Sequence, residues 1–383
     1  MNMLDTVILT IPRGSYRLRP EAFTPNANIL KMSGNYLLKC VNNPTASDKK
    51  EGTYKPRLTL VKRPTRNGSE IPLKIEFSVA KMLYGNNVDE VEEKDFEKVI
   101  SALHEAMLEM SVYVSHEDLR NAKVSAFHPS KNIELTTGYT SSYVITELHK
   151  IDVSKKMDLN RDSFRNSGHS LQFYTNSHSL VVYDKVSDLK KPDKRAMDKD
   201  QNSLQLSLFE TLTKKENKKE VLRIEARLAK KVKMNSILKG LKFKENPTFR
   251  DIFKKDLCQK ILLNYWDEII TGKNLFLFDV ESKPKKTLDA IFKNKPNIKP
   301  KDALYLVGLR VLSKEGIRDI RAVIERYATP RTWYRIAEDL KFLDEISGKT
   351  YHGWVKQIKD AIDDFVPFRL SNIEDCTVKN SKV

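Results

Sequence analysis

Three short segments of the sequence alternate polar and apolar residues in the way that half-buried β-strands do. Because successive side chains of a strand point to opposite faces of its sheet, each segment gathers its polar groups on one face. The groups that share these faces are Glu76 in the first segment, Tyr183 and Lys185 in the second, and Arg223, Glu225 and Arg227 in the third. If one sheet contains all three strands, one face collects a tyrosine, carboxylates and basic side chains. An ordinary half-exposed antiparallel sheet alternates in the same way, so the pattern alone leaves both interpretations open.

The elements that must position these side chains follow from the spacing of apolar residues. Runs rich in β-branched residues predict strands, the pair Asn67-Gly68 predicts a turn between two of them, and apolar stripes at helical spacing predict helices. The predicted strands are residues 4–11, 57–63, 71–79, 122–128, 169–174, 179–185 and 220–229. The predicted helices are residues 93–112, 138–150, 247–271, 285–292, 301–312, 314–327 and 330–345. Strands and helices that do not alternate regularly predict an α+β fold, an antiparallel-sheet domain followed by a helical C-terminal region.

Composition shifts along the chain predict where its parts begin and end. A polar, lysine-rich stretch at about 187–220 is typical of a mobile basic loop. The predicted parts are an α+β domain over 1–235 that contains this loop, a helical extension over 236–292, a second helical region over 301–370 and a polar tail over 371–383.

The charge balance indicates what kind of partner the protein binds. The chain carries 68 Lys and Arg against 51 Asp and Glu, a formal net charge of +17. A nucleic acid attracts such a chain because bound lysines and arginines release its counterions. No apolar run approaches the roughly 18–20 residues that span a bilayer, so no membrane partner is expected. Cys40, Cys258 and Cys376 lie far apart, which predicts a reducing cytoplasm without zinc or disulfide frameworks.

Several short motifs follow one another along the chain. A glycine opens the strand at Gly168–Tyr174, the triplet Tyr-Asp-Lys ends the strand at Ser179–Lys185, and an Arg-x-Glu core lies within Val221–Leu228. Taken in order, these segments resemble the signature of rolling-circle replication initiators of filamentous phages and staphylococcal-type plasmids. The glutamate strand Leu73–Phe77 and the Gly-Asn-Asn turn within Leu83–Asn87 resemble the phage group. The resemblance covers roughly residues 1–270. It implies a protein of the bacterial host cytoplasm that nicks one DNA strand at an origin and works with a host helicase and polymerase.

In that family a tyrosine attacks a phosphate, stays linked to the 5′ end and frees a 3′-hydroxyl. The resemblance therefore makes Tyr183 the first candidate nucleophile and Tyr174, on the neighbouring predicted strand, the second, and one or two tyrosines can act. A free tyrosine has a pKa of about 10 and needs a base or nearby positive charge. Lys185, expected on the same face, would supply that charge.

A divalent metal would assist the attack on phosphate, and Mg²⁺ or Mn²⁺ suits carboxylate ligands. The candidate ligands are Glu225, Glu76 and His128, the last at the expected end of a strand. Many related nickases hold their metal with two histidines separated by one apolar residue, and no two of the seven histidines here are spaced in that way. Arg223 and Arg227 are candidate DNA contacts beside Glu225.

A second candidate DNA-binding element lies near the C-terminus. Two predicted helices meet at Thr329-Pro330, and the second begins with Arg331 and contains Arg335. Thr329 is a candidate N-cap and Pro330 is suited to the first helical position. The pattern fits a helix-turn-helix whose two arginines bind phosphates. A purely structural pair of helices fits it equally well.

The sequence therefore supports a replication initiator that nicks DNA through a tyrosine and a divalent metal. The alternative is a non-enzymatic DNA-binding regulator on the same scaffold, because the histidine pair is missing. RNA binding is less favoured, since the sequence shows no aromatic-rich platform for single strands.

Overall fold

The structure of the 383-residue chain is a computed structural model. It describes residues 4–32, 37–45, 47–48, 53–66, 68–153, 156–163, 169–189, 210, 212–213, 219–271, 275–280, 283–348 and 350–370. Most of the basic loop predicted at 187–220, Asn67 of the predicted turn and the whole tail 371–383 lie outside these residues.

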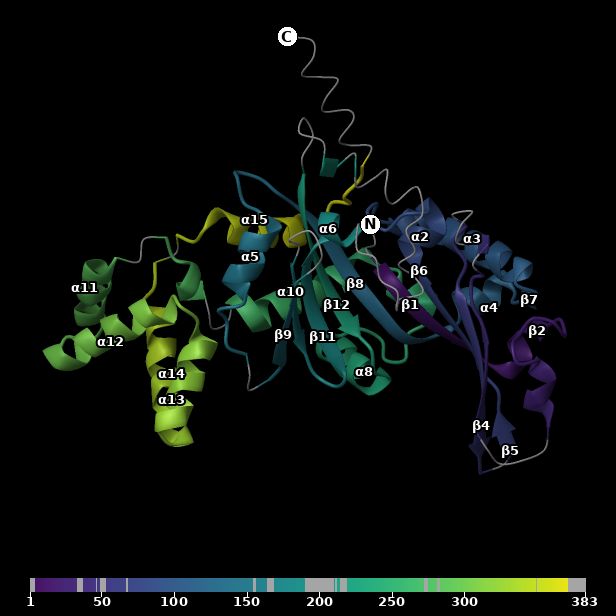
Figure 1. Ribbon diagram of the computed structural model, residues 1–383, viewed down its shortest axis with the longest axis horizontal. Coiled ribbons are helices and arrows are strands. Elements are labelled where there is room, and N and C mark those ends of the chain that lie inside the picture. Colours follow the sequence, from purple (N-terminus) through teal and green to yellow (C-terminus); the bar gives the residue numbers. More distant parts are fainter. Residues whose placement is uncertain are drawn as a thin grey trace, which may run out of the picture.

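The described strands form one antiparallel sheet of ten strands at the centre of the molecule (Figure 1). Its order is β3-β4-β6-β1-β8-β12-β11-β10-β9, and β5 pairs with the end of β4. The strands are β1 (Leu4–Ile11), β3 (Leu38–Asn42), β4 (Arg57–Thr65), β5 (Gly68–Glu70), β6 (Leu73–Ser78), β8 (Lys123–Leu135), β9 (Asp158–Ser163), β10 (His169–Tyr174), β11 (His178–Asp184) and β12 (Glu220–Leu228). Two short strands, β2 (Arg17–Leu18) and β7 (Val112–Tyr113), form a separate pair.

Helices cover the apolar face of this sheet. On β12, Leu222, Ile224 and Ala226 alternate with polar residues and join one continuous core with apolar side chains of the helices. The covering helices are α3 (Phe96–Glu109), α5 (Ser141–Leu148), α8 (Lys231–Gly240), α10 (Lys255–Trp266) and α15 (Gly353–Asp364). The short helices are α2 (Val79–Tyr84), α4 (His116–Arg120), α6 (Lys185–Leu189) and α9 (Phe249–Ile252). The predicted α+β fold is confirmed.

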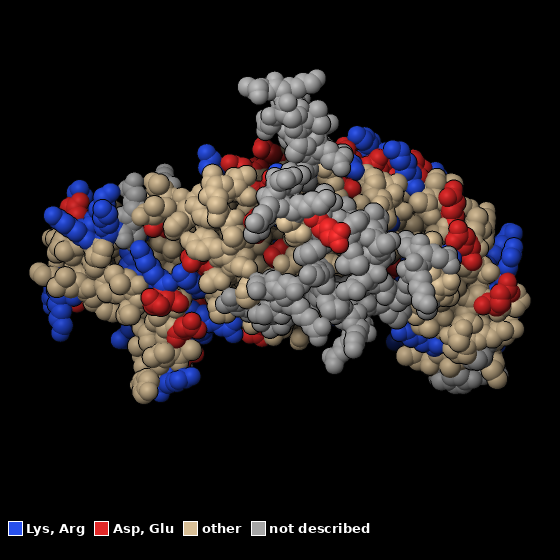
Figure 2. All heavy atoms as spheres, turned by 45° about the horizontal axis from the view of Figure 1, so that its top comes forward, with Lys and Arg blue, Asp and Glu red and all other residues tan. Residues whose placement is uncertain are grey.

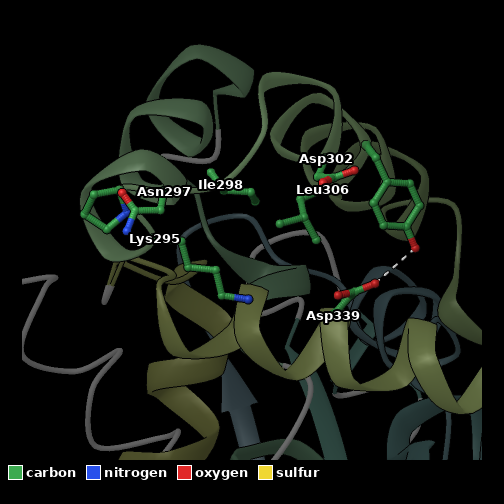
Figure 3. A pocket seen from close by; sticks show the side chains of 8 residues that line it. Lys295, Asn297, Ile298, Asp302, Leu306 and Asp339 are labelled. Carbon is green, nitrogen blue, oxygen red and sulfur yellow. Dashed lines mark hydrogen bonds between the residues drawn. The ribbon is translucent and has the colours of Figure 1, made fainter.

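The C-terminal region is helical, as predicted, and lies at one end of the sheet (Figure 1). It contains α11 (Pro284–Asn294), α12 (Pro300–Ser313), α13 (Ile317–Tyr327) and α14 (Pro330–Glu345). A pocket of about 640 Å³ opens between the loop at Lys295, helix α12 and helix α14. In its wall, Asp339 Oδ2 accepts a hydrogen bond from the Tyr305 hydroxyl at 3.2 Å, and Figure 3 marks this bond with the dashed line that ends at Asp339.

The predicted region at 301–370 contacts the sheet through its last described helix, α15. Helix α15, which lies within that region, packs against β8 and α10. Trp354 and Ile358 of α15 are fully buried in the core that the sheet and its helices share. Within the described part of the chain, none of the helices has the length and apolar character needed to cross a bilayer.

Two predicted boundaries are wrong in ways that matter for the site. Strand β8 does not end near His128 but continues to Leu135, because β12 pairs with it from Phe127 to Leu135, beyond the last residue that β1 pairs with, Pro129. Pro129 is tolerated within β8 because it lies where the register with β1 shifts, and prolines in sheets concentrate at such irregularities. Strand β11 ends at Asp184, so Lys185 begins α6 instead of ending the strand.

Candidate active site

Four neighbouring strands, in the order β1-β8-β12-β11, build a polar cluster on the sheet face opposite the main core. Across β11 and β12, Tyr183 stands directly opposite Arg223. Across β12 and β8, Glu225 stands opposite Ser130, which places His128 two residues further along the same face. The alternation in the sequence therefore predicts correctly that Tyr183, Arg223 and Glu225 share one face.

Three side chains of the cluster are suited to hold a metal ion. Among the described residues, Asp5, His128 and Glu225 each offer a ligand atom, and these atoms all lie within 4.8 Å of one another. His128 Nδ1 is 3.2 Å from Glu225 Oε1. Asp5 joins the other two from β1, whose register against β8 shifts between Leu4 and Val7. A β-bulge of this kind re-aims a side chain, which explains how Asp5 reaches the polar face.

Two arginines hold the carboxylates of this cluster. Arg227 Nε donates to Glu225 Oε1 at 2.8 Å, and Arg223 Nη2 donates to Asp5 Oδ1 at 3.0 Å and to Ser130 Oγ at 2.8 Å. Burial alone would raise the pKa of Glu225. The charge of Arg227, the hydrogen bond with His128 and the charge of Arg223 outweigh burial and hold that pKa well below its usual value. Glu225 is therefore a carboxylate at neutral pH, the form that binds a metal.

Tyr183 lies at the edge of the cluster, with its hydroxyl donating to Glu225 Oε2 at 3.4 Å. The side chain is buried, and burial raises the pKa of its hydroxyl well above the ordinary value. Its ring clusters with Val181 of the same strand, and Lys185, the first residue of α6, lies over the ring. The phenol is thus positioned but protonated in this state of the protein.

Lys185 is fully buried beside Tyr183. Its Nζ lies 5.7 Å from the centre of the Tyr183 ring and 3.8 Å from Asp188 Oδ2, and it has no hydrogen-bond partner among the described residues. Burial, followed by repulsion from Arg223, lowers the pKa of Lys185 to about 7. The middle residue of the triplet, Asp184, accepts hydrogen bonds from the backbone and hydroxyl of Ser187 and so fixes the turn from β11 into α6.

Two predicted site residues lie apart from the cluster. Tyr174 shares the face of Tyr183, but it lies four residues along β10 from Ser170, the residue opposite Tyr183. At about 3.3 Å per residue this separates the two tyrosines by roughly 13 Å. Glu76 lies on β6, beyond β1, where its Oε1 is 3.6 Å from Arg57 Nη1.

Asp5 is the site residue that the sequence analysis missed. It lies in a run of residues correctly predicted as a strand, but parity within the run assigns it to the buried face of Val7 and Leu9. The available signal was a lone carboxylate at the start of an otherwise apolar strand. Such a group is costly to bury unless it is paired, so its position called for a basic or metal partner.

Comparison with known protein families gives one match. Residues 30–246, more than half of the 383-residue chain, match the family described as the N-terminal region of a phage replication-associated protein. Neither the curated proteins nor the solved structures gave a match to this chain. The matched range contains His128, Tyr183, Lys185 and Glu225, whereas Asp5 precedes it. The resemblance to rolling-circle initiators is confirmed, and the chain belongs to this family of phage replication-associated proteins.

Proposed function

We propose that the protein nicks one strand of DNA at a replication origin, with Tyr183 as nucleophile and a divalent metal as cofactor. The observation that carries this proposal is the hydrogen bond from the Tyr183 hydroxyl to Glu225, one of the three side chains that could hold a metal. A nucleophile and a Lewis acid must reach the same phosphate, and here one carboxylate connects the two positions.

The residues of the cluster fit Mg²⁺ or Mn²⁺. Two carboxylates and an imidazole are ligands that suit these ions. Neighbouring ligands of an octahedral ion with bonds of about 2.1 Å lie about 3 Å apart, close to the 3.2 Å between His128 Nδ1 and Glu225 Oε1. Three protein ligands leave coordination positions for phosphate oxygens. When bound, the metal would polarise the scissile phosphate and stabilise its negative charge.

The protein's own side chains supply the nucleophile and manage its proton. With a pKa of about 7, Lys185 is partly neutral at neutral pH, and it can accept the proton that Tyr183 must lose once its Nζ turns from the ring toward the hydroxyl. The resulting ammonium then favours the phenolate. As the phenolate oxygen bonds to phosphorus, the bond from phosphorus to the 3′-oxygen breaks, and that oxygen leaves as a 3′-hydroxyl after taking a proton. Arg227, whose side chain is 40% exposed beside Glu225, is placed to contact the incoming phosphate.

Burial of Tyr183 sets a condition on this chemistry. Only 7% of the residue is exposed, so DNA reaches the hydroxyl only after neighbouring groups move aside. The same burial, together with the missing histidine pair, favours the second candidate function, a DNA-binding regulator that keeps the scaffold without nicking.

The two functions are separated by an adduct assay. A supercoiled plasmid carrying the replicon that encodes this chain is incubated with the protein and Mn²⁺ or EDTA, then digested, 3′-labelled and run on a denaturing gel. We expect a metal-dependent protein–DNA adduct that Tyr183→Phe abolishes and Tyr174→Phe retains. An adduct lost only in Tyr174→Phe would assign the nucleophile to Tyr174. No adduct from the wild-type protein with metal would support the regulator.

A further inference from the structure

Helices α13 and α14 form a hairpin with a fixed base. They lie side by side and project away from the sheet (Figure 1). The base is attached where the Ile317 amide donates to the Lys150 carbonyl at 2.9 Å and Arg321 Nη1 lies 3.4 Å from Asp152 Oδ2. Between the helices, buried Trp333 packs under Arg321, whose guanidinium carbon is 5.7 Å from the ring centre. The hairpin is therefore a rigid support for whatever its tip carries.

The tip of the hairpin consists of the end of α13 and the start of α14, residues 326–335. It combines exposed aromatic rings with positive charge that has no carboxylate partner among the described residues. Tyr327 is 87% exposed and Tyr334 is 58% exposed. Arg326, Arg331 and Arg335 are also exposed, and none of the three has a carboxylate partner within the part of the chain that the structure describes. In Figure 2, Lys or Arg side chains (blue) lie at the end of the lobe that protrudes downward at the lower left.

This arrangement does not stabilise the fold. Arg331 and Arg335 are four residues apart on one helix, and like charges at this spacing destabilise a helix. The Tyr327 ring leaves most of its apolar surface in water. Thr329 occupies the N-cap position of α14 without a capping hydrogen bond from its side chain. A partner with negative charge and flat apolar surfaces would give these features a physical rationale.

We propose that the tip of the α13–α14 hairpin binds single-stranded DNA, with Tyr327 stacking on a base and Arg326, Arg331 and Arg335 contacting phosphates. Single strands offer both features, since each base has an exposed face beside a charged backbone. A duplex offers the phosphates but hides the base faces in its stack. The inference rests on the proposed function in one respect: nicking and strand displacement produce the single strand that the tip would bind.

The test measures binding without nicking. Full-length protein in EDTA is titrated into a fluorescent single strand of about 20 nucleotides and into the duplex made from it, and anisotropy is recorded at several salt concentrations. We expect Tyr327→Ala to weaken single-strand binding about tenfold and duplex binding less than twofold. Tyr327→Phe, which keeps the stacking ring, should bind like the wild type.

The arginines are tested together. Replacing Arg326, Arg331 and Arg335 with alanine should reduce the salt slope for the single strand by about 2, because each phosphate contact contributes about 0.7. The matched controls are Lys341→Ala and Tyr113→Ala. Lys341 is an exposed residue of α14 away from the tip, and Tyr113 is an exposed tyrosine on β7. Both should stay within twofold of the wild type.

Three results would overturn the inference: unchanged single-strand affinity in Tyr327→Ala, an equal loss on the duplex, or an unchanged salt slope in the triple variant. Circular dichroism would verify that the variants fold, as expected for changes at exposed positions. Because the assay contains no metal, it is independent of the adduct experiment. A wild-type protein that forms no adduct would refute nicking. Unchanged single-strand affinity in Tyr327→Ala would refute only the role of the tip.

Discussion

The sheet face around Tyr183 and the tip of the α13–α14 hairpin use the same residue types in opposite ways. Both combine arginine and tyrosine, but Arg223 is buried and paired with Asp5, whereas Arg331 is exposed and has no carboxylate partner among the described residues. Burial strengthens electrostatic interactions and shifts pKa values, which suits a site that performs chemistry. Exposed, unpaired charge suits reversible contacts that salt weakens. The difference supports both proposals, that Tyr183 belongs to a preorganised reaction centre and that Tyr327 belongs to a binding surface.

The contrast between the two regions depends most on whether the buried cluster around Glu225 binds a metal. We expect Glu225→Gln to abolish metal-dependent nicking and to weaken Mn²⁺ binding by about 100-fold or more, because even residues outside the first coordination sphere contribute 10–100-fold. Titration of Mn²⁺ followed by electron paramagnetic resonance measures the affinity directly. Glu76→Gln is the matched control, since Glu76 lies on the same sheet but outside the cluster. Equal loss in both variants would show that the cluster is not the metal site.

The same substitution in the two regions should have different effects on stability. Arg223→Ala leaves Asp5 without its partner and Ser130 without a donor, and breaking a buried ion pair costs about 3–5 kcal/mol in the free energy of unfolding. Arg331→Ala removes an exposed, unpaired charge and should change that free energy by less than about 0.5 kcal/mol. Urea denaturation of both variants measures the contrast. Similar values for both would mean that the Arg223 network adds nothing to stability.

Sequence periodicity predicted which residues share a face, but not which of them meet. Alternation placed Tyr183, Arg223 and Glu225 on one face correctly, because the period of a strand is fixed by its backbone. It also placed Glu76 on a polar face, and the family resemblance added Tyr174 on the neighbouring strand. Both lie further along the sheet, since their distance from Glu225 depends on strand order and register. The place of Asp5 on the polar face depends on a bulge in the pairing of β1 with β8. The sequence therefore signalled that this carboxylate needs a partner, but not which partner.

The tip was predicted in outline by the same local rules. The break at Thr329-Pro330 and the two helices around it follow from spacing, capping and the fixed φ of proline, all of which act within a few residues. Local patterns do not predict which side chains of the tip are exposed to solvent. Whether Tyr327 and Arg326 face solvent or the neighbouring helix depends on how α13 docks onto the loop at Lys150.

The smallest expected effect concerns the pH dependence that burial gives to Lys185. Burial lowers its pKa from the ordinary 10.5 to about 7 in the folded chain, so between these values the unfolded chain binds a proton that the folded chain does not. Stability should therefore rise with pH, by about 1.4 kcal/mol per unit at most for a single group. Between pH 7.5 and 8.5 we expect the wild-type free energy of unfolding to increase by about 1 kcal/mol relative to Lys185→Met, which has no group to titrate.

Lys185→Arg, which stays charged at both pH values, should show no such rise in the free energy of unfolding and should be less stable than the wild type at both. Guanidinium denaturation at the two pH values tests this, and parallel behaviour of the wild type and Lys185→Met would show that Lys185 keeps its proton. In that case it could not accept one from Tyr183.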